Sequence, residues 1–465
     1  MKIEETTVIR KDSSDLLISD SESSNSPLPN CANQESLGCM SQHIWFQLIR
    51  LKKTFMGFLN KKFYSRLRHA GLDKFVTSMI NIPPSASLGE KVCIIGSGNW
   101  GTSIAITVAN NAQRLSFCDP IVNMWVYDED IQYKGDMKKL SEIINEEHEN
   151  VKYLPDIKLP HNLRAEPDLA KACSDASLII FVIPHQFLPR ILRRMKSYIP
   201  SHSRGVSLMK GMNFDLEKKV PVLISKSIEE NLSSSFDDCH FKFQCGVLMG
   251  ANVAKDVARN EVSESTLACD FDSRKGIDMN ERTRLIFDSK TLHVQHVKDV
   301  AGAELAGALK NVIALGAGFI DALEFGNNTK ASLLRVGLKE MISFSQMFFK
   351  GVKTDTFLES CGIADLITTC YGGRNRKCAE EYARRRLASD RKKLDGNDCE
   401  HLWYEVEKEL LNGQKLQGTL ACREVHIVLE SRGLLHRFPL IKCIYDIAFE
   451  GTDVGQIVEG IKVYK

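Results

Sequence analysis

A glycine-rich turn between a short apolar run and an apolar helical pattern is the feature that most constrains the fold of this chain. Residues 91–105 read KVCIIGSGNWGTSIA and contain the pattern GxGxxG. In this position the first glycine permits a tight turn, the second lets the backbone touch a pyrophosphate, and the third brings helix and strand together. The helix start adds N–H donors and a positive dipole end. We therefore predict a dinucleotide site whose turn residues are Gly96, Ser97, Gly98, Asn99, Trp100 and Gly101.

The residues at the end of the second predicted strand indicate whether the cofactor is NAD or NADP. Residues 124–130 read MWVYDED, which places Asp128, Glu129 and Asp130 where an NADP site needs an arginine for the 2′-phosphate. Carboxylates repel that phosphate, so the sequence favours NAD. The interval from Gly101 exceeds the usual ~20 residues, and the acid that contacts the ribose is therefore left open.

Alternating apolar runs and helical patterns predict the fold class. Brief, β-rich runs bounded by turn residues predict strands at 92–95, 122–126, 178–183, 206–209 and 247–249. Helical segments between them, such as 102–111 and 187–195, indicate a parallel sheet that is covered on both faces. Beyond residue 297 the chain has long helical patterns at 301–323, 333–349 and 420–432. We expect an α/β Rossmann-type doubly wound parallel sheet domain at 89–298, followed by an all-α C-terminal domain at 299–465.

Residues 1–88 have a different character. The first 40 or so are rich in Ser, Asn and acids without an apolar period, which predicts a disordered arm. Ile44, Leu48, Leu51 and Phe55 then follow a helical spacing among basic residues, which predicts a basic amphipathic stretch. Two interpretations stay open: a membrane or protein contact through residues 41–70, or packing on the neighbouring domain. The acidic start is unlike a transit peptide and no signal peptide is evident, so we expect a cytoplasmic protein.

Composition excludes several classes of protein. The 465 residues contain 61 Lys and Arg against 59 Asp and Glu, so there is no general electrostatic reason to bind nucleic acid. The 14 cysteines show neither CxxC nor a zinc spacing, so we expect reduced thiols and no metal site. No run approaches the ~20 apolar residues of a membrane-spanning helix.

Further blocks of sequence carry a family resemblance. In chain order they are EEHENVKYLP (146–155), PHQF (184–187), LMKG (208–211), MGAN (249–252), GALKNV (307–312), ADLITTCYGGRNR (364–376) and NGQKLQG (412–418). With the glycine turn they resemble the eukaryotic cytosolic NAD-dependent glycerol-3-phosphate dehydrogenase family, from about Lys91 to about Glu459. The resemblance implies reversible reduction of dihydroxyacetone phosphate by NADH to sn-glycerol 3-phosphate. It also implies a homodimer and a metabolic role that links glycolysis to glycerolipid synthesis and reoxidises cytosolic NADH.

The catalytic residues implied by the resemblance are Lys310, Lys210, Asp365 and Asn311. Lys310 lies in the otherwise apolar helical segment 306–315, where a buried lysine indicates electrostatic work. By resemblance it polarises the carbonyl and exchanges the proton at oxygen. Lys210 follows the strand 206–209, at the edge where ligands of open α/β sheets bind. A second cation there would help to keep a lysine pKa low, and Asp365 is the implied carboxylate partner of the lysines.

Substrate and cofactor positions follow from the same resemblance. Arg374 lies in the turn GGRN (372–375), where glycines expose N–H groups and a guanidinium can pair bidentately with phosphate. The other implied substrate-binding residues are Asn375, Thr369, Asn252 and Lys210. The implied cofactor-binding residues outside the turn are Tyr127, Phe187, Lys210, Ala254, Arg374, Lys415 and Gln417. Tyr127 replaces an expected phenylalanine without losing its capacity to stack, and His185 is expected to have a backbone partner instead of a catalytic role.

Two alternatives compete with this interpretation. One is another β-hydroxyacid dehydrogenase, for example of the 6-phosphogluconate type, and the blocks at 373–375 and 411–418 argue against it. The other is a catalytically silent NAD-binding regulator that docks a membrane partner, and the presence of Lys210, Lys310 and Asp365 argues against that. The segment 384–405, with the basic run Arg391–Lys393, is longer than the family needs and receives no role.

Overall fold

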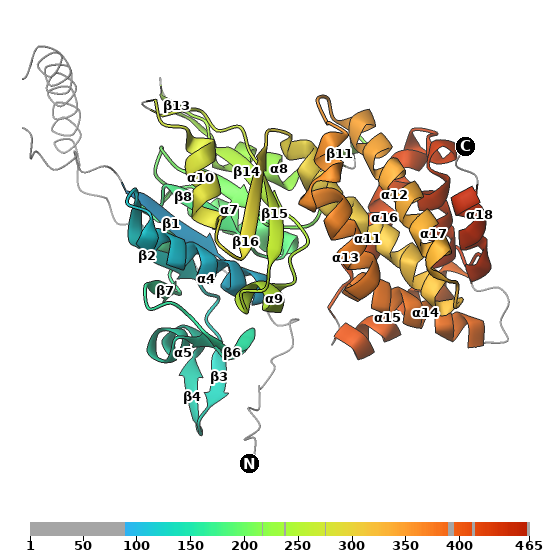
Figure 1. Cartoon of the computed structure of the whole chain (residues 1–465), viewed down its shortest axis with the longest axis horizontal. Coiled ribbons are helices and arrows are strands. Elements are labelled where there is room, and N and C mark those ends of the chain that lie inside the picture. Colours follow the sequence, from blue (N-terminus) through green and yellow to red (C-terminus); the bar gives the residue numbers. More distant parts are fainter. Residues whose placement is uncertain are drawn as a thin grey trace, which may run out of the picture. The chain divides into compact units, whose positions relative to one another are not determined.

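A computed structural model describes residues 89–215, 217–236, 239–274, 276–388, 395–411 and 414–462 (Figure 1). The arm and the amphipathic stretch predicted within residues 1–88 lie outside the described residues. The basic run Arg391–Lys393 also lies outside them.

An 8-stranded sheet forms the first domain, with the strand order β16-β15-β14-β9-β8-β1-β2-β7. Its strands are β1 (Glu90–Ile95), β2 (Cys118–Trp125), β7 (Leu163–Glu166), β8 (Leu178–Phe181), β9 (Arg204–Ser207), β14 (Gln244–Met249), β15 (Ser263–Ala268) and β16 (Leu292–Val297). All neighbours are parallel except β14 and β15, which are antiparallel. The sheet is therefore mainly parallel, and β7, β15 and β16 were missed because polar residues interrupt their apolar patterns.

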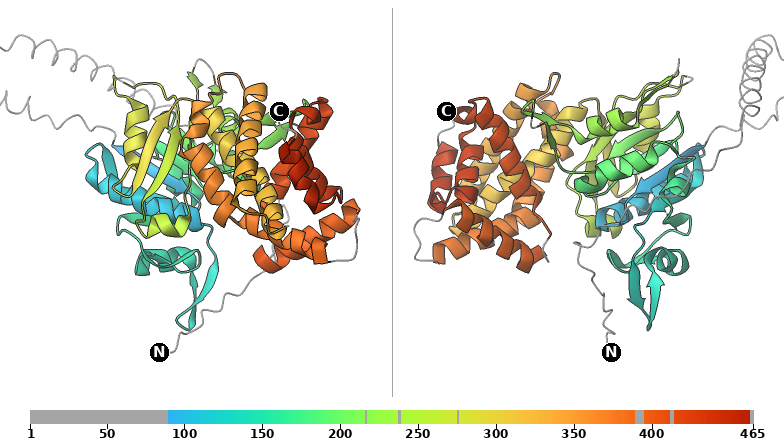
Figure 2. Two further views of the ribbon diagram at one scale, coloured as in Figure 1. Left: turned by 45° about the vertical axis from the view of Figure 1, so that its right-hand side comes forward. Right: turned by 180° about the vertical axis from the view of Figure 1, so that it is seen from behind.

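Helices cover both faces of this sheet, which explains why β1 is apolar at successive positions. Val92 and Ile94 pack in one cluster, whereas Cys93 and Ile95 pack in another on the opposite face. The helices on the first face are α4 (Asn99–Arg114), α5 (Leu140–Glu147), α9 (Ala254–Ala258) and α10 (Met279–Phe287), and those on the second are α6 (Leu169–Cys173), α7 (Leu188–Met195) and α8 (Ile224–Leu232). Figure 2 shows this domain from two further directions.

Short antiparallel pairs of strands form in the loops of this domain. They are β3 (Asp130–Tyr133) with β4 (Asp136–Lys139), β5 (Glu149–Asn150) with β6 (Leu154–Lys158), β10 (Asn213–Asp215) with β11 (Val220–Val222), and β12 (Ser234–Phe236) with β13 (Cys239–Phe241). The predicted helix 187–195 instead begins with the 3₁₀ turn η1 (His185–Phe187) before α7.

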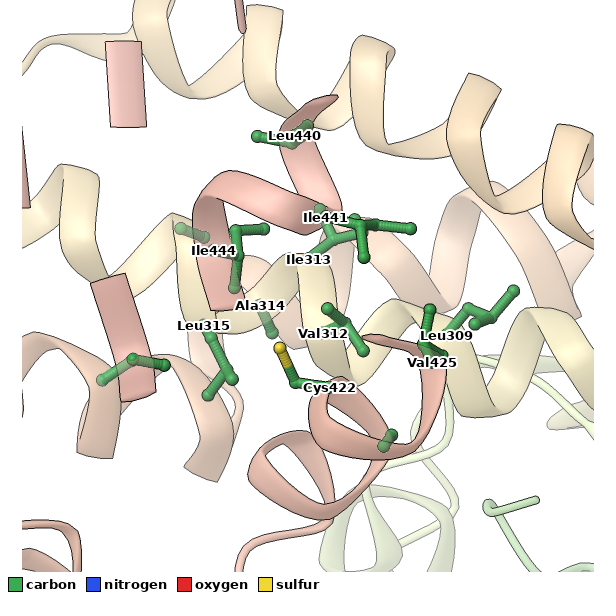
Figure 3. Packing of buried hydrophobic residues seen from close by; sticks show 14 of the residues in the cluster. Leu309, Val312, Ile313, Ala314, Leu315, Cys422, Val425, Leu440, Ile441 and Ile444 are labelled. Atoms are coloured by element: carbon green, nitrogen blue, oxygen red, sulfur yellow. The ribbon is translucent and has the colours of Figure 1, made fainter. Parts of the chain in front are cut away.

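The second domain consists of helices around one buried helix, α11 (Val300–Ala322). The others are α12 (Asn327–Phe348), α13 (Asp365–Gly372), α14 (Arg374–Ala388), α15 (Gly396–Leu411), α16 (Gln417–Ser431), α17 (Pro439–Phe449) and α18 (Ile457–Lys462), with short turns η2 (Asp355–Leu358), η3 (Ser360–Ala364), η4 (Leu435–Arg437) and η5 (Val454–Gln456). In Figure 3, Val312 and Ile313 of α11 pack with Cys422 of α16 and Ile441 of α17.

Helix α11 has the length and hydropathy of a membrane-spanning helix, and it alone passes that test among the described residues. The whole of its apolar window is buried inside the protein, as expected for the central helix of a bundle. Lys310 lies within this apolar helix, so its charge must be met by partners inside the protein.

Candidate active site

The glycine turn joins β1 to α4 and leaves one side of the backbone open. Gly96 has a φ of +119°, and a Cβ there would lie 2.4 Å from the carbonyl oxygen of Val182. A Cβ on Gly101 would lie 2.2 Å from the carbonyl oxygen of Gly96, so this glycine permits the close approach of α4. At Gly98, by contrast, no atom from another part of the described chain lies within 4 Å of the Cβ position. A pyrophosphate can therefore approach Gly98 directly, and the turn fits a dinucleotide.

Neighbouring turn residues hold this backbone in place. Ser97 is buried, and its carbonyl oxygen accepts hydrogen bonds from Thr102 Oγ1 at 3.0 Å and Asn150 Nδ2 at 2.9 Å. Asn99 and Trp100 are the first residues of α4. The turn is thus fixed from behind by buried side chains, with the start of α4 available to a phosphate.

Aromatic side chains stand beside the turn. Tyr127 follows β2 and Phe187 follows β8, and these two strands flank β1 in the sheet. Both side chains are exposed, at 59 % and 49 %. Ala254 is the first residue of α9, a helix on the same face of the sheet as α4. Large exposed rings at this edge can stack against the rings of a dinucleotide.

The three acids after β2 differ in their partners. Glu129 forms an ion pair with Lys152 and accepts a hydrogen bond from Tyr153 at 2.6 Å. Asp130 pairs with Lys139 at 2.8 Å. Asp128 accepts only the N–H of Ser141, at 3.1 Å, and has no ion pair within the described ranges. Asp128 is therefore the acid whose charge is available to a ribose hydroxyl. The sequence did not indicate which of the three acids contacts the ribose, and this geometry favours Asp128.

Two lysines share one carboxylate where the sheet meets the helical domain. Lys210 follows β9 and donates to Asp365 Oδ2 at 2.7 Å and to the Gly250 carbonyl oxygen at 2.8 Å. Lys310 of α11 forms an ion pair with Oδ1 of the same Asp365 and donates to Thr369 Oγ1 at 2.6 Å. Asp365 and Thr369 lie one turn apart on α13, so a single helix face positions both partners.

Burial lowers the pKa of Lys310. Its side chain is 5 % exposed, whereas that of Lys210 is 27 % exposed. Desolvation lowers the pKa of Lys310 to about 7, assisted by the positive charge of Lys210 and opposed by Asp365. A lysine with this pKa exchanges a proton near neutral pH, as a general acid or base must. The predicted burial of Lys310 is confirmed, and the charge of Lys210 acts on the pKa of Lys310 in the predicted direction.

Asparagine side chains connect the helices behind this network. Asn375 donates to Asn311 Oδ1 at 2.9 Å, and its own oxygen accepts the N–H of Gly418 at 3.0 Å. Both asparagines are buried. They join α11, α14 and the start of α16, so Asn375 has a structural contact in addition to its predicted place near the phosphate.

The predicted phosphate clamp lies at a junction between helices. Helix α13 ends at Gly372 and α14 begins at Arg374, whose exposed guanidinium donates to Gln414 Oε1 at 3.4 Å. Lys415 pairs with the buried Glu407 at 2.9 Å, which holds the segment before Gln417 and α16. No carboxylate among the described residues pairs with Arg374, so its charge is available to an anion beside the N-terminus of α14.

Asn252 lies in the loop after β14, and the strand β15 holds its amide. Its nitrogen donates to the Glu264 carbonyl oxygen and its oxygen accepts the Ser265 hydroxyl, both at 2.8 Å. This contact fixes the same loop whose Gly250 carbonyl receives Lys210. The role of Gly250 had no signal in the sequence, because any residue has a backbone carbonyl.

Two titratable side chains near Lys210 were not predicted correctly from the sequence: the prediction for His185 is wrong, and Glu424 was overlooked. The sequence predicts a backbone partner for His185, but in the described part of the chain its ring makes no hydrogen bond, and it lines a small cavity with Lys210 and Glu424. Glu424 received no role from the sequence. The signal that could have revealed it is its position seven residues after Gln417, which places both on one face of α16.

Comparison with known proteins agrees with this geometry. Residues 91–274 match the family described as NAD-dependent glycerol-3-phosphate dehydrogenase N-terminus, and residues 299–459 match the corresponding C-terminus. The cytoplasmic NAD(+) glycerol-3-phosphate dehydrogenase of Pongo abelii is 46 % identical over 370 residues, which cover 79 % of this chain and 96 % of that protein. The enzyme of the same name from Rattus norvegicus is 45 % identical over 371 residues, or 80 % of this chain and 97 % of the relative.

Solved structures give the same result. A glycerol-3-phosphate dehydrogenase from Saccharomyces cerevisiae is 43 % identical, covers 80 % of this chain and 99 % of its own, and superposes with a TM-score of 0.70. The Plasmodium falciparum glycerol-3-phosphate dehydrogenase is 34 % identical over 81 % of this chain and 96 % of its own, also with a TM-score of 0.70. With a glycine turn open to a dinucleotide and two lysines on one buried carboxylate, this chain belongs to the NAD-dependent glycerol-3-phosphate dehydrogenase family.

Proposed function

We propose that this chain reduces dihydroxyacetone phosphate with NADH to sn-glycerol 3-phosphate and catalyses the reverse oxidation. The observation that carries the proposal is the buried ion pair of Lys310 and Asp365, which Lys210 joins from the carboxyl edge of the sheet. When bound, NADH supplies the hydride for this reduction. The open backbone at Gly98 supports binding of a dinucleotide, and the Asp128 carboxylate, which has no ion pair among the described residues, supports NAD over NADP.

In the proposed reaction Lys310 donates a proton to the C2 oxygen of the ketone, and its neutral amine removes that proton in the reverse direction. Asp365 and Thr369 hold its Nζ in place. Lys210 adds a second positive charge where the ketone oxygen becomes negative in the transition state. Asn311, the next residue on α11, supports the helix through its bond to Asn375.

The phosphate of the substrate is proposed to bind Arg374, with the N-terminus of α14 beside it. The guanidinium is exposed and its one described contact is a long hydrogen bond to a neutral amide, so no carboxylate competes with the substrate. Asn375, Thr369 and Asn252 remain proposed substrate neighbours, although each of them also bonds to the protein. The substrate would thus lie with its phosphate at Arg374 and its ketone at Lys310.

The wider assignments are also proposals. Residues 89–298 would bind the cofactor and residues 299–465 the substrate; β16 ends at Val297 and α11 begins at Val300. The names of the relatives support a cytoplasmic location. The homodimer rests on the family resemblance, and residues 1–88 are proposed as an accessory region with a membrane or protein contact through residues 41–70.

A spectrophotometric assay tests the proposed reaction. The purified chain should consume NADH when dihydroxyacetone phosphate is added, and it should produce NADH from sn-glycerol 3-phosphate. 6-Phosphogluconate should support no turnover. If NADH binds but neither substrate of the pair is converted, the chain is the silent nucleotide-binding regulator instead.

A further inference from the structure

A small cavity next to the lysine network is lined in part by two polar side chains, His185 and Glu424, that the proposed reaction does not use. Its polar lining comes from both domains: His185 and Lys210 from the sheet domain, and Asn311, Gln417 and Glu424 from the helical domain. The cavity is about the size of one water molecule, and its wall offers several hydrogen-bonding partners.

The two domains approach each other closely at Gly211. His185 Nδ1 and Gln417 Oε1 each lie 3.8 Å from the position that a Cβ on Gly211 would occupy. Gln417 and Glu424 lie on the same face of α16, and both line the cavity. A water in this space would therefore touch side chains from both domains, among them Glu424, His185 and Lys210.

Glu424 and His185 carry no permanent partner. Across the described segments of the chain, neither side chain forms a hydrogen bond or an ion pair. Burial raises the pKa of Glu424 to about 7 and lowers the pKa of His185. Glu424 can therefore gain and lose a proton at neutral pH at low energetic cost.

Lys310 needs such a source of protons. Each reduction leaves it as a neutral amine, and its side chain is only 5 % exposed, with its Nζ enclosed by Asp365 and Thr369. Lys210 is the more exposed lysine, shares Asp365 with Lys310 and lines the cavity. A proton that enters through the cavity therefore reaches Lys310 by way of Lys210.

We propose that Glu424 is the entry residue of a proton relay, which passes through water in this cavity to Lys210 and from there to Lys310. The protons balance. An N–H bond of Lys310 breaks as the O–H bond of the product forms, and Lys210 passes a proton to the neutral amine. The cavity water then protonates Lys210 and regains a proton from the Glu424 carboxyl group, which is finally reprotonated by solvent. The relay rests on the proposed role of Lys310.

Rapid mixing of the full-length enzyme with NADH and dihydroxyacetone phosphate at pH 6.5, in weak buffer with a pH indicator, tests the relay. Loss of NADH absorbance reports reduction, and the indicator reports proton uptake from solvent. In the wild type both signals should change together. In Glu424→Gln the first turnover should keep its rate, because Lys310 starts protonated, whereas proton uptake and later turnovers should slow about tenfold or more.

Control variants distinguish the relay from a purely structural role of Glu424. Glu430→Gln makes the same change on an exposed carboxyl group of α16, and it should behave as wild type. Glu424→Asp keeps a carboxyl group and should recover part of the uptake rate. Equal uptake rates in Glu424→Gln and wild type would overturn the relay, as would a defect confined to His185→Gln. Failure of the proposed function looks different, because no NADH would then be consumed in any variant.

Discussion

The two halves of the site differ in the atoms that make it. The nucleotide half is a run of adjacent residues, from Gly96 to Gly101, in which backbone conformation and the lack of side chains matter. The catalytic half combines charged side chains from the end of β9, from α11 and from α13, and its chemistry depends on burial and mutual charge. Substitutions should therefore act through shape in the first half and through electrostatics in the second.

The largest effect is expected from removing the charge of Lys310. Lys310→Met should lower kcat by about 10² to 10⁴, the usual contribution of a positioned proton donor, with little change in NADH affinity. Steady-state kinetics and NADH fluorescence titration measure the two quantities. Lys330 is a matched control, since it is also buried in the helical domain and paired with an aspartate, Asp321, at 2.6 Å. If Lys330→Met lowers kcat equally, the loss of any buried ion pair is enough to cause the effect.

Arg374→Ala should give the next largest loss. The pair that Arg374 would form with the phosphate is desolvated only when the substrate binds, and losing one member of such a pair costs about 2–5 kcal/mol, or roughly 30- to several thousand-fold in kcat/KM for dihydroxyacetone phosphate. Dihydroxyacetone has no phosphate and should be converted equally by both enzymes. The measurement is the ratio of the two specificity constants before and after substitution. An equal loss for both substrates would mean that Arg374 supports structure and that the phosphate binds elsewhere.

The acids after β2 should discriminate between the two cofactors. NADPH should be the poorer donor by about 10²-fold in kcat/KM, because like charges brought together cost several kcal/mol. Asp128→Ser should reduce this discrimination more than Asp130→Ser, since Asp130 is already paired with Lys139. Comparable constants for NADH and NADPH in the wild type would refute the charge argument.

Two glycines of the same turn should respond differently to alanine. Gly96→Ala places a Cβ 2.4 Å from a carbonyl oxygen at a φ of +119°, so it should lower the free energy of unfolding by about 1–3 kcal/mol or more. Gly98→Ala meets no protein atom and should leave Tm unchanged, while the Kd for NADH rises about tenfold because the methyl group occupies the pyrophosphate position. Thermal denaturation and fluorescence titration separate the two effects. A normal NADH affinity in Gly98→Ala would place the pyrophosphate elsewhere.

The smallest effect is a shift along the pH axis. Reduction needs the ammonium form of Lys310, whose pKa in the free enzyme is about 7, so kcat/KM should be constant below that pH and fall above it. Oxidation needs the neutral amine and should rise through the same pH. Lys210→Met should lower the rate at every pH, because it removes a charge from the reacting oxygen; it also removes a charge that lowers the pKa of Lys310, so the midpoint of the remaining activity should move to higher pH in both directions. The exposed Lys298→Met is the control, and an unmoved midpoint in Lys210→Met would contradict the coupling.

Prediction from sequence succeeded where local patterns decide the structure. The apolar runs of β1 and β8 and the long helix α11 are recognisable because each buries nearly every side chain. Prediction failed for the edge strand β7 (LRAE) and for β15 (SESTLA), which is antiparallel to β14, because their polar residues interrupt the apolar pattern of a strand. It also failed for His185, because the presence of a hydrogen-bonding partner depends on what the fold places beside the ring.

For the site, the sequence by itself determined the glycine turn, the acids after β2 and the presence of a lysine in an apolar helix. Each of these depends on residues close together in the chain, where steric and periodic rules apply directly. Only the tertiary structure decided that Lys210 and Lys310 share Asp365, that Asn375 bonds to Asn311, and that Glu424 faces a cavity beside Lys210. These contacts join segments that are far apart in sequence, and their energies depend on burial and distance, which exist only after the two domains have folded against each other.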